Sequence, residues 1–245
     1  MSARATRATA VRVFRQLRRD RRTIALILVV PCALIVLVDQ IFVDQPSVFQ
    51  KVGVPLLGLF PLVSMFLVTS ITMLRERMSG TLERLLTLPL EKLDLLLGYA
   101  IAFGVLAAVQ ATIVSLVGFG ILDLTVVNSK LLVIALAVAN AILGMALGLF
   151  LSAFARTEFQ AVQFMPAFIL PQILLCGLLV PRDDMAQWLR WLSALMPFTY
   201  AYDALSRAAT DPTLGAAFWA DVLVVVGVTV LALVLGAGTL RRRTP

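Results

Sequence analysis

The sequence predicts an all-α integral membrane protein with six transmembrane helices. Hydrophobic residues make up 60% of its 245 residues and charged residues only 14%, whereas soluble domains are about 45–50% apolar and about 25% charged. This composition leaves too few polar side chains to cover a soluble globule. A helix needs about 20 apolar residues to cross the hydrocarbon core of a bilayer, and six such runs are present. We therefore interpret residues 1–245 as a single transmembrane domain.

The six apolar runs lack the alternation of barrel strands, which favours helices. The first run follows an arginine-rich start, but it is too long for a cleaved signal peptide, and Pro31-Cys32-Ala33 leads into further hydrophobic residues. We read it as a retained span. The predicted spans are Thr23–Val43, Val52–Leu74, Leu95–Leu122, Leu131–Phe154, Phe159–Val180 and Val222–Leu240.

The positions of the basic residues predict the orientation. Most of the 21 Lys and Arg residues precede the first span, lie between spans two and three, or follow the last span. The positive-inside rule then places both termini in the cytoplasm. The same placement explains the net charge of +7 without a nucleic-acid partner. The Arg-for-Lys bias and the abundance of Ala, Val and Leu indicate a bacterium, so a multi-pass protein of the plasma (cell inner) membrane is expected.

Residues 1–22 form the first of three predicted structured segments outside the spans. Their apolar side chains share one helical face and arginines occupy the rest, which is typical of an interfacial helix on an anionic inner leaflet. The alternative is a disordered basic tail. The apolar face consists of Ala10, Val13, Phe14 and Leu17.

The cytoplasmic loop 75–94 is the second segment. Leu82, Leu85 and Leu86 lie on one side of a predicted amphipathic helix, and Pro89 ends it. From the residues alone, this helix either has a function of its own or merely connects two spans.

The outer segment 181–221 is the third. Apolar residues recur at helical spacing after Asp183-Asp184, a candidate cap, until Pro197; a second helix is predicted over Tyr200–Arg207. Its tryptophans and tyrosines suit the membrane–water boundary. We expect these helices to re-enter the outer leaflet, the alternative being a helix flat on its surface.

Several function classes are excluded or disfavoured. The chain has no histidine, which excludes a Ser-His-Asp triad and His-ligated metals, and Cys32 and Cys176 fall in apolar runs as small hydrophobes. It has no Gly-Lys-Ser/Thr phosphate loop, so the chain itself is not expected to be an enzyme or to bind a cofactor. The spans show no central charge, which weighs against an ATP-independent secondary transporter or channel, the alternative function. A membrane enzyme would need a cluster of nucleophiles or metal ligands, and none is evident.

Small and polar residues within the spans predict helix contacts. Small residues at spacing four predict close packing of the third and fourth spans; the two stripes are Ala100, Gly104, Ala108 and Thr112, and Asn140, Gly144, Gly148 and Ser152. Prolines and glutamines in the fifth span predict that it faces protein or a cavity. As candidate pathway-lining residues we name Gln163, Pro166, Pro171 and Gln172, with plain hydrogen bonding between helices as the alternative.

Two blocks carry a resemblance to a known family. Arg75 to Pro89 reads RERMSGTLERLLTLP, which resembles the signature of the type-2 permeases of ATP-binding-cassette exporters. The outer segment, with LLVP from Leu178, WLRWL from Trp188 and PFTYAYDAL from Pro197, is similar to the second block of that family. The likeness covers essentially the whole chain and is nearest to the daunorubicin-resistance type. Met78 replaces a frequent glutamate, and Ser206 precedes Arg207 where arginine often follows directly.

The resemblance implies a function. The chain would be the membrane subunit of an exporter for an apolar or amphipathic substrate, such as a drug or lipid-like molecule. Two cytoplasmic subunits would bind ATP and Mg, and a second permease copy, identical or related, would complete the assembly in the bilayer. The implied ATPase-coupling residues are Glu76, Arg77, Gly80, Thr81, Leu82, Glu83, Arg84, Leu86 and Pro89. Those of the outer re-entrant helices are Pro181, Trp188, Trp191, Pro197, Tyr200 and Asp203.

Overall fold

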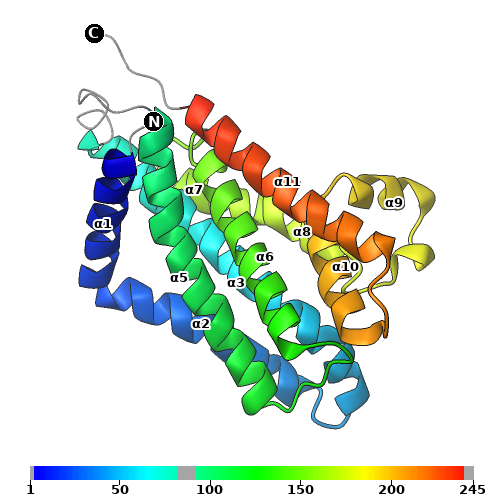
Figure 1. Ribbon diagram of the computed structural model, residues 1–245. Helices are drawn as coiled ribbons and strands as arrows, with labels where there is room; N and C mark the ends of the chain where they lie inside the picture. Colours follow the sequence, from blue (N-terminus) through cyan, green and yellow to red (C-terminus); the bar gives the residue numbers. More distant parts are fainter. Residues whose placement is uncertain (1–2, 82–91, 240–245) are drawn as a thin grey trace.

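The computed structural model describes residues 3–81 and 92–239, and every regular element in these ranges is a helix (Figure 1). The long helices are α1 (Ala3–Arg19), α2 (Arg21–Ile41), α3 (Pro46–Met78), α5 (Lys92–Gly120), α6 (Lys130–Leu151) and α11 (Ala216–Gly238). The shorter elements are α7 (Glu158–Phe164), the π-helix η1 (Met165–Ile169), α8 (Leu170–Leu175), the 3-10 turn η2 (Arg182–Asp184), α9 (Gln187–Ala194) and α10 (Pro197–Thr210).

Five of the six predicted spans are continuous helices. Of the described helices, α2, α3, α5, α6 and α11 are long and apolar enough to cross a membrane. The fifth predicted span, Phe159–Val180, is instead α7, η1 and α8 in direct succession, and this succession ends at Leu175, so residues 176–180 are not helical. Pro166 is the second residue of η1 and Pro171 the second residue of α8, and neither supplies a backbone N–H. The regular α-helical hydrogen bonding is therefore interrupted, and a π-helical turn takes up the irregularity.

Helices α3 and α6 form the centre of the bundle. A Cβ atom at Gly144 would overlap the carbonyl oxygen of Leu62, and one at Gly148 would overlap that of Phe66. The hydroxyl of Thr69 donates to its own helix at Met65 (2.7 Å) and lies 3.2 Å from the carbonyl oxygen of Met145 in α6. The glycines of the fourth span therefore mark a backbone-to-backbone contact, as predicted.

The stripe predicted in the third span does not behave in the same way. No described atom lies within 4 Å of a Cβ placed at Gly104, so this glycine is not at a close helix contact. The close contacts of α5 lie elsewhere: Gly98 packs against Thr9 of α1, and Gly118 packs against Leu57 of α3.

Two buried amide side chains inside the spans donate hydrogen bonds to neighbouring helices. Pro31 cannot donate to the carbonyl of Ile27 one turn earlier, and the amide of Gln110 in α5 donates to that carbonyl instead (2.9 Å). Asn140 donates to the carbonyl of Ala201 in α10 (3.2 Å). Within the five long spanning helices, charged residues occur only in about the first or last two turns.

Helix α1 packs against protein rather than presenting its whole apolar face to lipid. Ala10, Val13 and Leu17 are buried, whereas Phe14 is 45% exposed, and α5 is the main neighbour of this helix. The four residues predicted to form one apolar face therefore do not share one environment, and the placement of this helix on a leaflet stays a prediction. The helix also ends at Arg19, earlier than predicted, because Asp20 caps α2 through Thr23.

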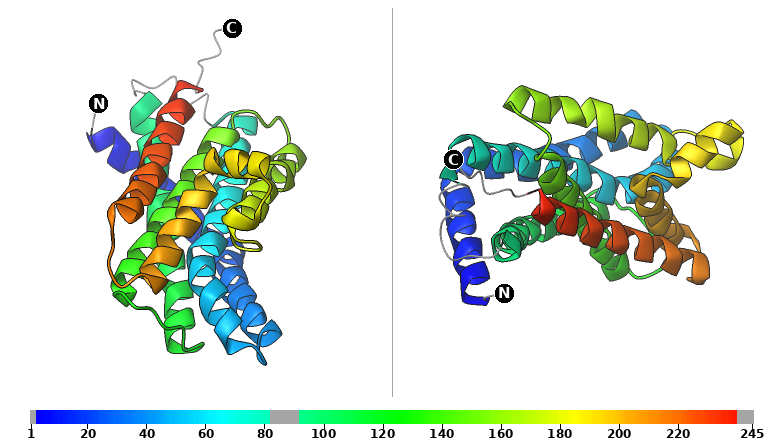
Figure 2. Two further views of the ribbon diagram at one scale, coloured as in Figure 1. Left: turned by 90° about the vertical axis from the view of Figure 1, so that its right-hand side faces the viewer. Right: turned by 90° about the horizontal axis from the view of Figure 1, so that it is seen from above.

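The arrangement brings the ends of several helices together. In Figure 1 the end of α3, the start of α5 and the end of α11 gather at the end of the bundle where α1 lies. The view from above in Figure 2 shows the row of α7, η1 and α8 along one flank, α11 along the other, and α9 at the periphery. We call the end that contains α1 the basal end.

The contact between α3 and α6 is testable. Gly144→Ala should destabilise the protein by about 1–3 kcal/mol, because the backbone of Leu62 cannot move away without separating the helices. Gly104→Ala should be neutral or slightly stabilising, because the added methyl group has free space and alanine favours helix. Thermal unfolding of the two variants in detergent distinguishes the positions; equal losses would refute the tight contact.

Candidate functional site

The signature sequence begins inside α3 rather than in a loop. Arg75, Glu76 and Arg77 belong to the last turn of α3, and the backbone N–H of Ser79 donates to Arg75 (2.9 Å). Gly80 follows with φ +69, a left-handed conformation that ends helices and favours glycine. The predicted loop 75–94 is therefore shorter than expected, because the position of this glycine, and not the start of the charged run, determines where the helix stops.

Three side chains from different helices meet at the end of α3. Glu76 is only 4% exposed, and its Oε1 lies 3.5 Å from the guanidinium of Arg12 in α1. Arg12 also donates to the hydroxyl of Tyr99 in α5 and lies 5.5 Å from the centroid of that ring. We call Arg12, Glu76 and Tyr99 the basal cluster. It fixes the last turn of α3 to α1 and α5.

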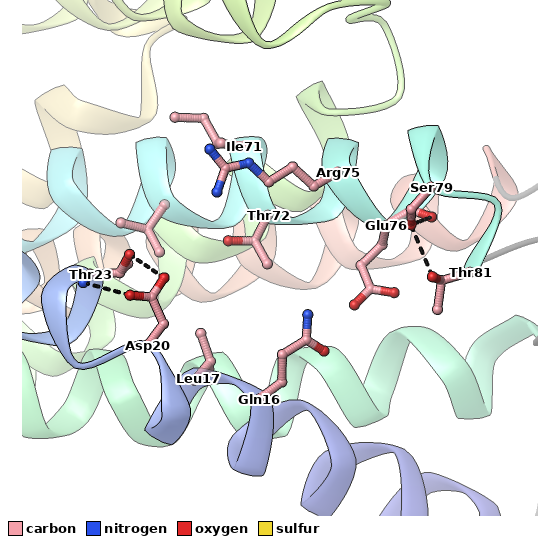
Figure 3. Close-up of a pocket in the computed structure, with 11 residues that line it drawn as sticks. Gln16, Leu17, Asp20, Thr23, Ile71, Thr72, Arg75, Glu76, Ser79 and Thr81 are labelled. Carbon is pink, nitrogen blue, oxygen red and sulfur yellow. Dashed lines mark hydrogen bonds between the residues drawn. The ribbon is translucent and has the colours of Figure 1, made fainter.

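A cleft of 440 Å³ opens beside the basal cluster, between α3 and the corner that joins α1 to α2 (Figure 3). Asp20 and Thr23 line one end, and Ser79 and Thr81 the other. The carboxylate of Glu76 points into the cleft, and its Oε2 has no hydrogen-bond partner among the described residues. The hydroxyls of Ser79 and Thr81 lie 2.9 Å apart.

An exposed ion pair joins the end of α3 to the start of α7. Arg75 donates twice to Glu158, over 2.7 and 2.9 Å. The hydrogen bond from Arg75 lowers the pKa of the Glu158 carboxyl, and desolvation opposes this effect. The basal cluster and this ion pair thus connect the last turn of α3 to three other helices, α1, α5 and α7.

Of the other predicted coupling residues, the structure describes Arg77, Gly80 and Thr81. Arg77 is partly buried and its guanidinium lies 3.5 Å from the hydroxyl of Thr239, just after α11. Gly80 and Thr81 follow α3, at the edge of the described range. The predictions for Leu82, Glu83, Arg84, Leu86 and Pro89 fall outside the described residues.

The outer segment contains two main helices, as predicted, with different boundaries. Asp183 and Asp184 form a 3-10 turn and do not cap α9, which starts at Gln187. Pro197 is the first residue of α10, a longer helix than predicted, and α10 packs on α3, α6 and α11. Because α10 lies within the bundle, the carbonyl of Ala201 can accept the hydrogen bond that Asn140 donates from the neighbouring span α6.

Several side-chain hydrogen bonds hold α9 and α10 in place. Arg182, next to Pro181, donates to Asp203 (2.8 Å), and Tyr200 donates to the carbonyl of Ala194 (2.7 Å). Burial raises the pKa of the Asp203 carboxyl, and the charge of Arg182 opposes that rise. The tryptophans of α9 point away from the bundle, with Trp188 68% and Trp191 71% exposed.

The four candidate pathway residues do not share one surface of this chain. Gln163 and Pro166 are exposed, Pro171 is partly buried, and Gln172 is buried and donates to the carbonyl of Phe168 (3.0 Å). In the part of the chain that the structure describes, no group of three metal-ligating His, Cys, Asp or Glu side chains exists.

Sequence reasoning missed Arg12, Tyr99 and Glu158. For Arg12 the sequence did contain a signal. Glu76 lies near the end of an apolar helix, where a buried carboxylate requires a cationic partner. The signal does not identify the partner, since the segment before the first span contains many arginines of similar setting.

Comparison with known proteins identifies the family. Residues 4–209 match the sequence model of the ABC-2 type transporter. The chain belongs to the ABC-2 type transporter family. Its membrane-spanning helices and its signature at the end of α3 agree with that membership.

Curated relatives of this ABC-2 chain are longer proteins. It is 31% identical over 147 residues to YbhR of Escherichia coli, named a probable multidrug ABC transporter permease, covering 59% of this chain and 40% of the relative. It is 28% identical over 140 residues to YbhS of the same organism (57% and 37%). It is also 28% identical over 138 residues to ABC transporter G family member 20 of Dictyostelium discoideum (56% and 19%). The aligned part therefore spans less than half the length of these relatives.

The basal cluster makes a testable contribution to stability. Arg12→Gln should destabilise the protein by about 1–3 kcal/mol, because the buried carboxylate of Glu76 loses its charged partner. Arg15→Gln, an exposed position of the same helix, should change stability by less than about 0.5 kcal/mol. Thermal unfolding in detergent measures both; a loss at Arg15 equal to that at Arg12 would contradict the cluster.

The pair of Arg75 and Glu158 predicts a pH dependence. A carboxyl whose pKa is lowered on folding adds stability above its unfolded pKa and loses that contribution as pH falls through the lowered value. Both side chains are exposed, so the effect should stay below about 1 kcal/mol. The stability difference between wild type and Glu158→Gln should therefore be present at neutral pH and vanish in acid. The same stability for wild type and Glu158→Gln at neutral pH would show that the pair is not formed.

Proposed function

We propose that this chain is the membrane-spanning permease subunit of an ATP-binding-cassette exporter. It moves an apolar or amphipathic substrate, of drug or lipid-like character, with energy from ATP hydrolysed by a separate subunit. The observation that carries the proposal is the connection at the end of α3. There the signature residues continue the helix, and Glu76 ties its last turn to α1 and α5. A force applied to the segment after α3 reaches three helices at once.

The proposed topology has six spans, with α7, η1 and α8 together as the fifth. The basal end faces the cytoplasm of a bacterium and both termini lie on that side of the plasma membrane. The arginines of α1 and those at the end of α3 support this orientation through the positive-inside rule. The outer segment 181–221 then lies at the opposite leaflet, where the exposed tryptophans of α9 suit the membrane boundary.

The proposed assembly contains two permease copies, identical or related, and two copies of a cytoplasmic ATP-binding subunit that hold ATP and Mg. The absence of a phosphate-binding loop from this sequence supports a separate energy source. The name that YbhR carries, a multidrug permease, supports the substrate class.

The loop 75–94 is proposed to be the coupling element. An element that transmits movement must resist bending. The first four residues of this segment belong to α3, which is helical through Met78, and Arg12 holds them through its ion pair with Glu76. Glu83 and Arg84 would set the register of the ATPase contact by charge pairing. In the fifth span, the exposed residues Gln163 and Pro166 are the better candidates for lining a path, since Gln172 is buried.

Coupling can be tested in proteoliposomes that contain the permease with its ATP-binding subunit. Gly80→Ala strains a left-handed position by about 1–2 kcal/mol, and Glu83→Ala removes a signature charge. Each should lower the substrate moved per ATP hydrolysed by at least about fivefold while co-purification with the ATPase persists. Gly215→Ala, a glycine with free space and no positive φ, is the matched control.

The contradicting results are equally clear. If the segment Gly80–Pro89 can be scrambled without change in transport per ATP, the coupling role is wrong. If the purified chain alone moves substrate in response to an ion gradient without nucleotide, it is a secondary transporter or channel.

A further inference from the structure

The cleft beside the basal cluster contains an acceptor atom that the chain leaves without a donor. Glu76 is 4% exposed, and its Oε1 lies 3.5 Å from Arg12, but its Oε2 has no hydrogen-bond partner among the described residues. Figure 3 shows this carboxylate directed into the cleft. A buried carboxylate oxygen without a donor destabilises the chain. The cleft therefore favours a ligand that supplies the missing donor.

The charges at the cleft favour a cationic ligand. Asp20, Glu76 and Arg75 are the ionised side chains that line it among the described residues. Arg75 already donates twice to Glu158, and Arg12 already faces Glu76. Three carboxylates thus stand against two guanidinium groups, an excess of one negative charge. The other arginines of α1 do not line the cleft, and they are exposed, so that solvent and salt screen them.

Hydroxyl groups and apolar side chains form the rest of the cleft. Ser79 and Thr81 line the same end as Glu76, and their hydroxyl oxygens lie 2.9 Å apart. Leu17 and Ile71 lie towards the other end (Figure 3), and Val68 adds to the apolar wall. The volume of 440 Å³ falls in the range of about 300–1,000 Å³ that is usual for small-molecule sites.

We propose that this cleft binds an amphipathic primary amine, with its ammonium group at Glu76 and its apolar body along Leu17, Val68 and Ile71. A primary ammonium group has three N–H donors and no acceptor. It can therefore donate to Oε2 of Glu76 and to a neighbouring hydroxyl at the same time. An anionic ligand would be repelled by the carboxylate, and a wholly apolar ligand would leave Oε2 without a donor.

An occupant of the cleft would contact two parts of the chain at once. The cleft lies between the last turns of α3 and the corner that joins α1 to α2. A bound amine therefore adds contacts between the signature-bearing end of α3 and that corner. It stabilises the folded chain to the extent that it occupies the cleft. This inference concerns binding by the single chain and does not depend on the proposed transport activity.

The test measures binding of monodansylcadaverine, a primary amine with an aromatic body, to the purified chain in neutral detergent. Fluorescence titration reports binding after subtraction of the signal from protein-free micelles. The uncharged comparison is the dansyl amide of pentylamine, which lacks the ammonium group. Wild type should bind the amine at least about tenfold more tightly than the comparison, because a charge-assisted hydrogen bond forms only with the amine.

Variants of the lining residues locate the binding. Glu76→Gln should weaken amine binding by about tenfold and remove the preference over the uncharged comparison. Asp20→Asn keeps a residue that caps helices and should weaken amine binding by about twofold to threefold. Thr72→Phe narrows the cleft and should weaken binding of both compounds. The matched control is Asp44→Asn, an exposed acid in the turn after α2, which should bind like wild type.

The contradicting outcomes are specific. Equal affinity of wild type for the two compounds overturns the inference, and so does a preference for the amine that persists in Glu76→Gln. If Glu76→Gln does not fold because Arg12 loses its partner, Asp20→Asn and Thr72→Phe decide, and unchanged amine binding in both overturns the inference. An equal loss in Asp44→Asn also overturns it, because net charge alone would then attract the amine.

Discussion

The backbone contact between α3 and α6 fixes the frame on which the rest of the structure depends. Gly144 and Gly148 allow α3 to lie against α6 at the carbonyl groups of Leu62 and Phe66. With 33 residues, α3 is about 50 Å long, more than the hydrocarbon core of about 30 Å requires. Its last turn therefore extends past the apolar part of the bundle. This extension carries the signature residues on a helix that its middle section holds in place.

A second constraint explains why the charged groups are found where they are. In lipid, polar groups must find partners inside the protein. Gln110 meets this requirement for the carbonyl that Pro31 leaves free. Glu76 can be buried only because α1 supplies Arg12 and α5 supplies Tyr99 nearby. The candidate site is thus assembled where the spans end and neighbouring helices can provide a charge.

The sequence predicted the long spans well because each is an apolar run of sufficient length, and it identified the signature from local residues. It failed where packing between distant segments decides. Pro166 and Pro171 gave a reason to expect contacts, but not the π-helical turn between α7 and α8. The charged run suggested a loop from Arg75, whereas Gly80 ends the helix later. The partner of Glu76 was hidden among similar arginines, and the apolar residues of α1 face α5, which no local pattern reveals.

The account rests on a stiff element on the cytoplasmic side, next to an ATP-driven partner. The most direct measurement introduces one reporter thiol, Thr81→Cys, in a chain with Cys32→Ala and Cys176→Ala, and labels membrane vesicles of both orientations with a membrane-impermeant maleimide. The account predicts labelling in inside-out vesicles only, and protection when the ATP-binding subunit is present. Labelling from the outside, or no protection by the partner, would contradict it.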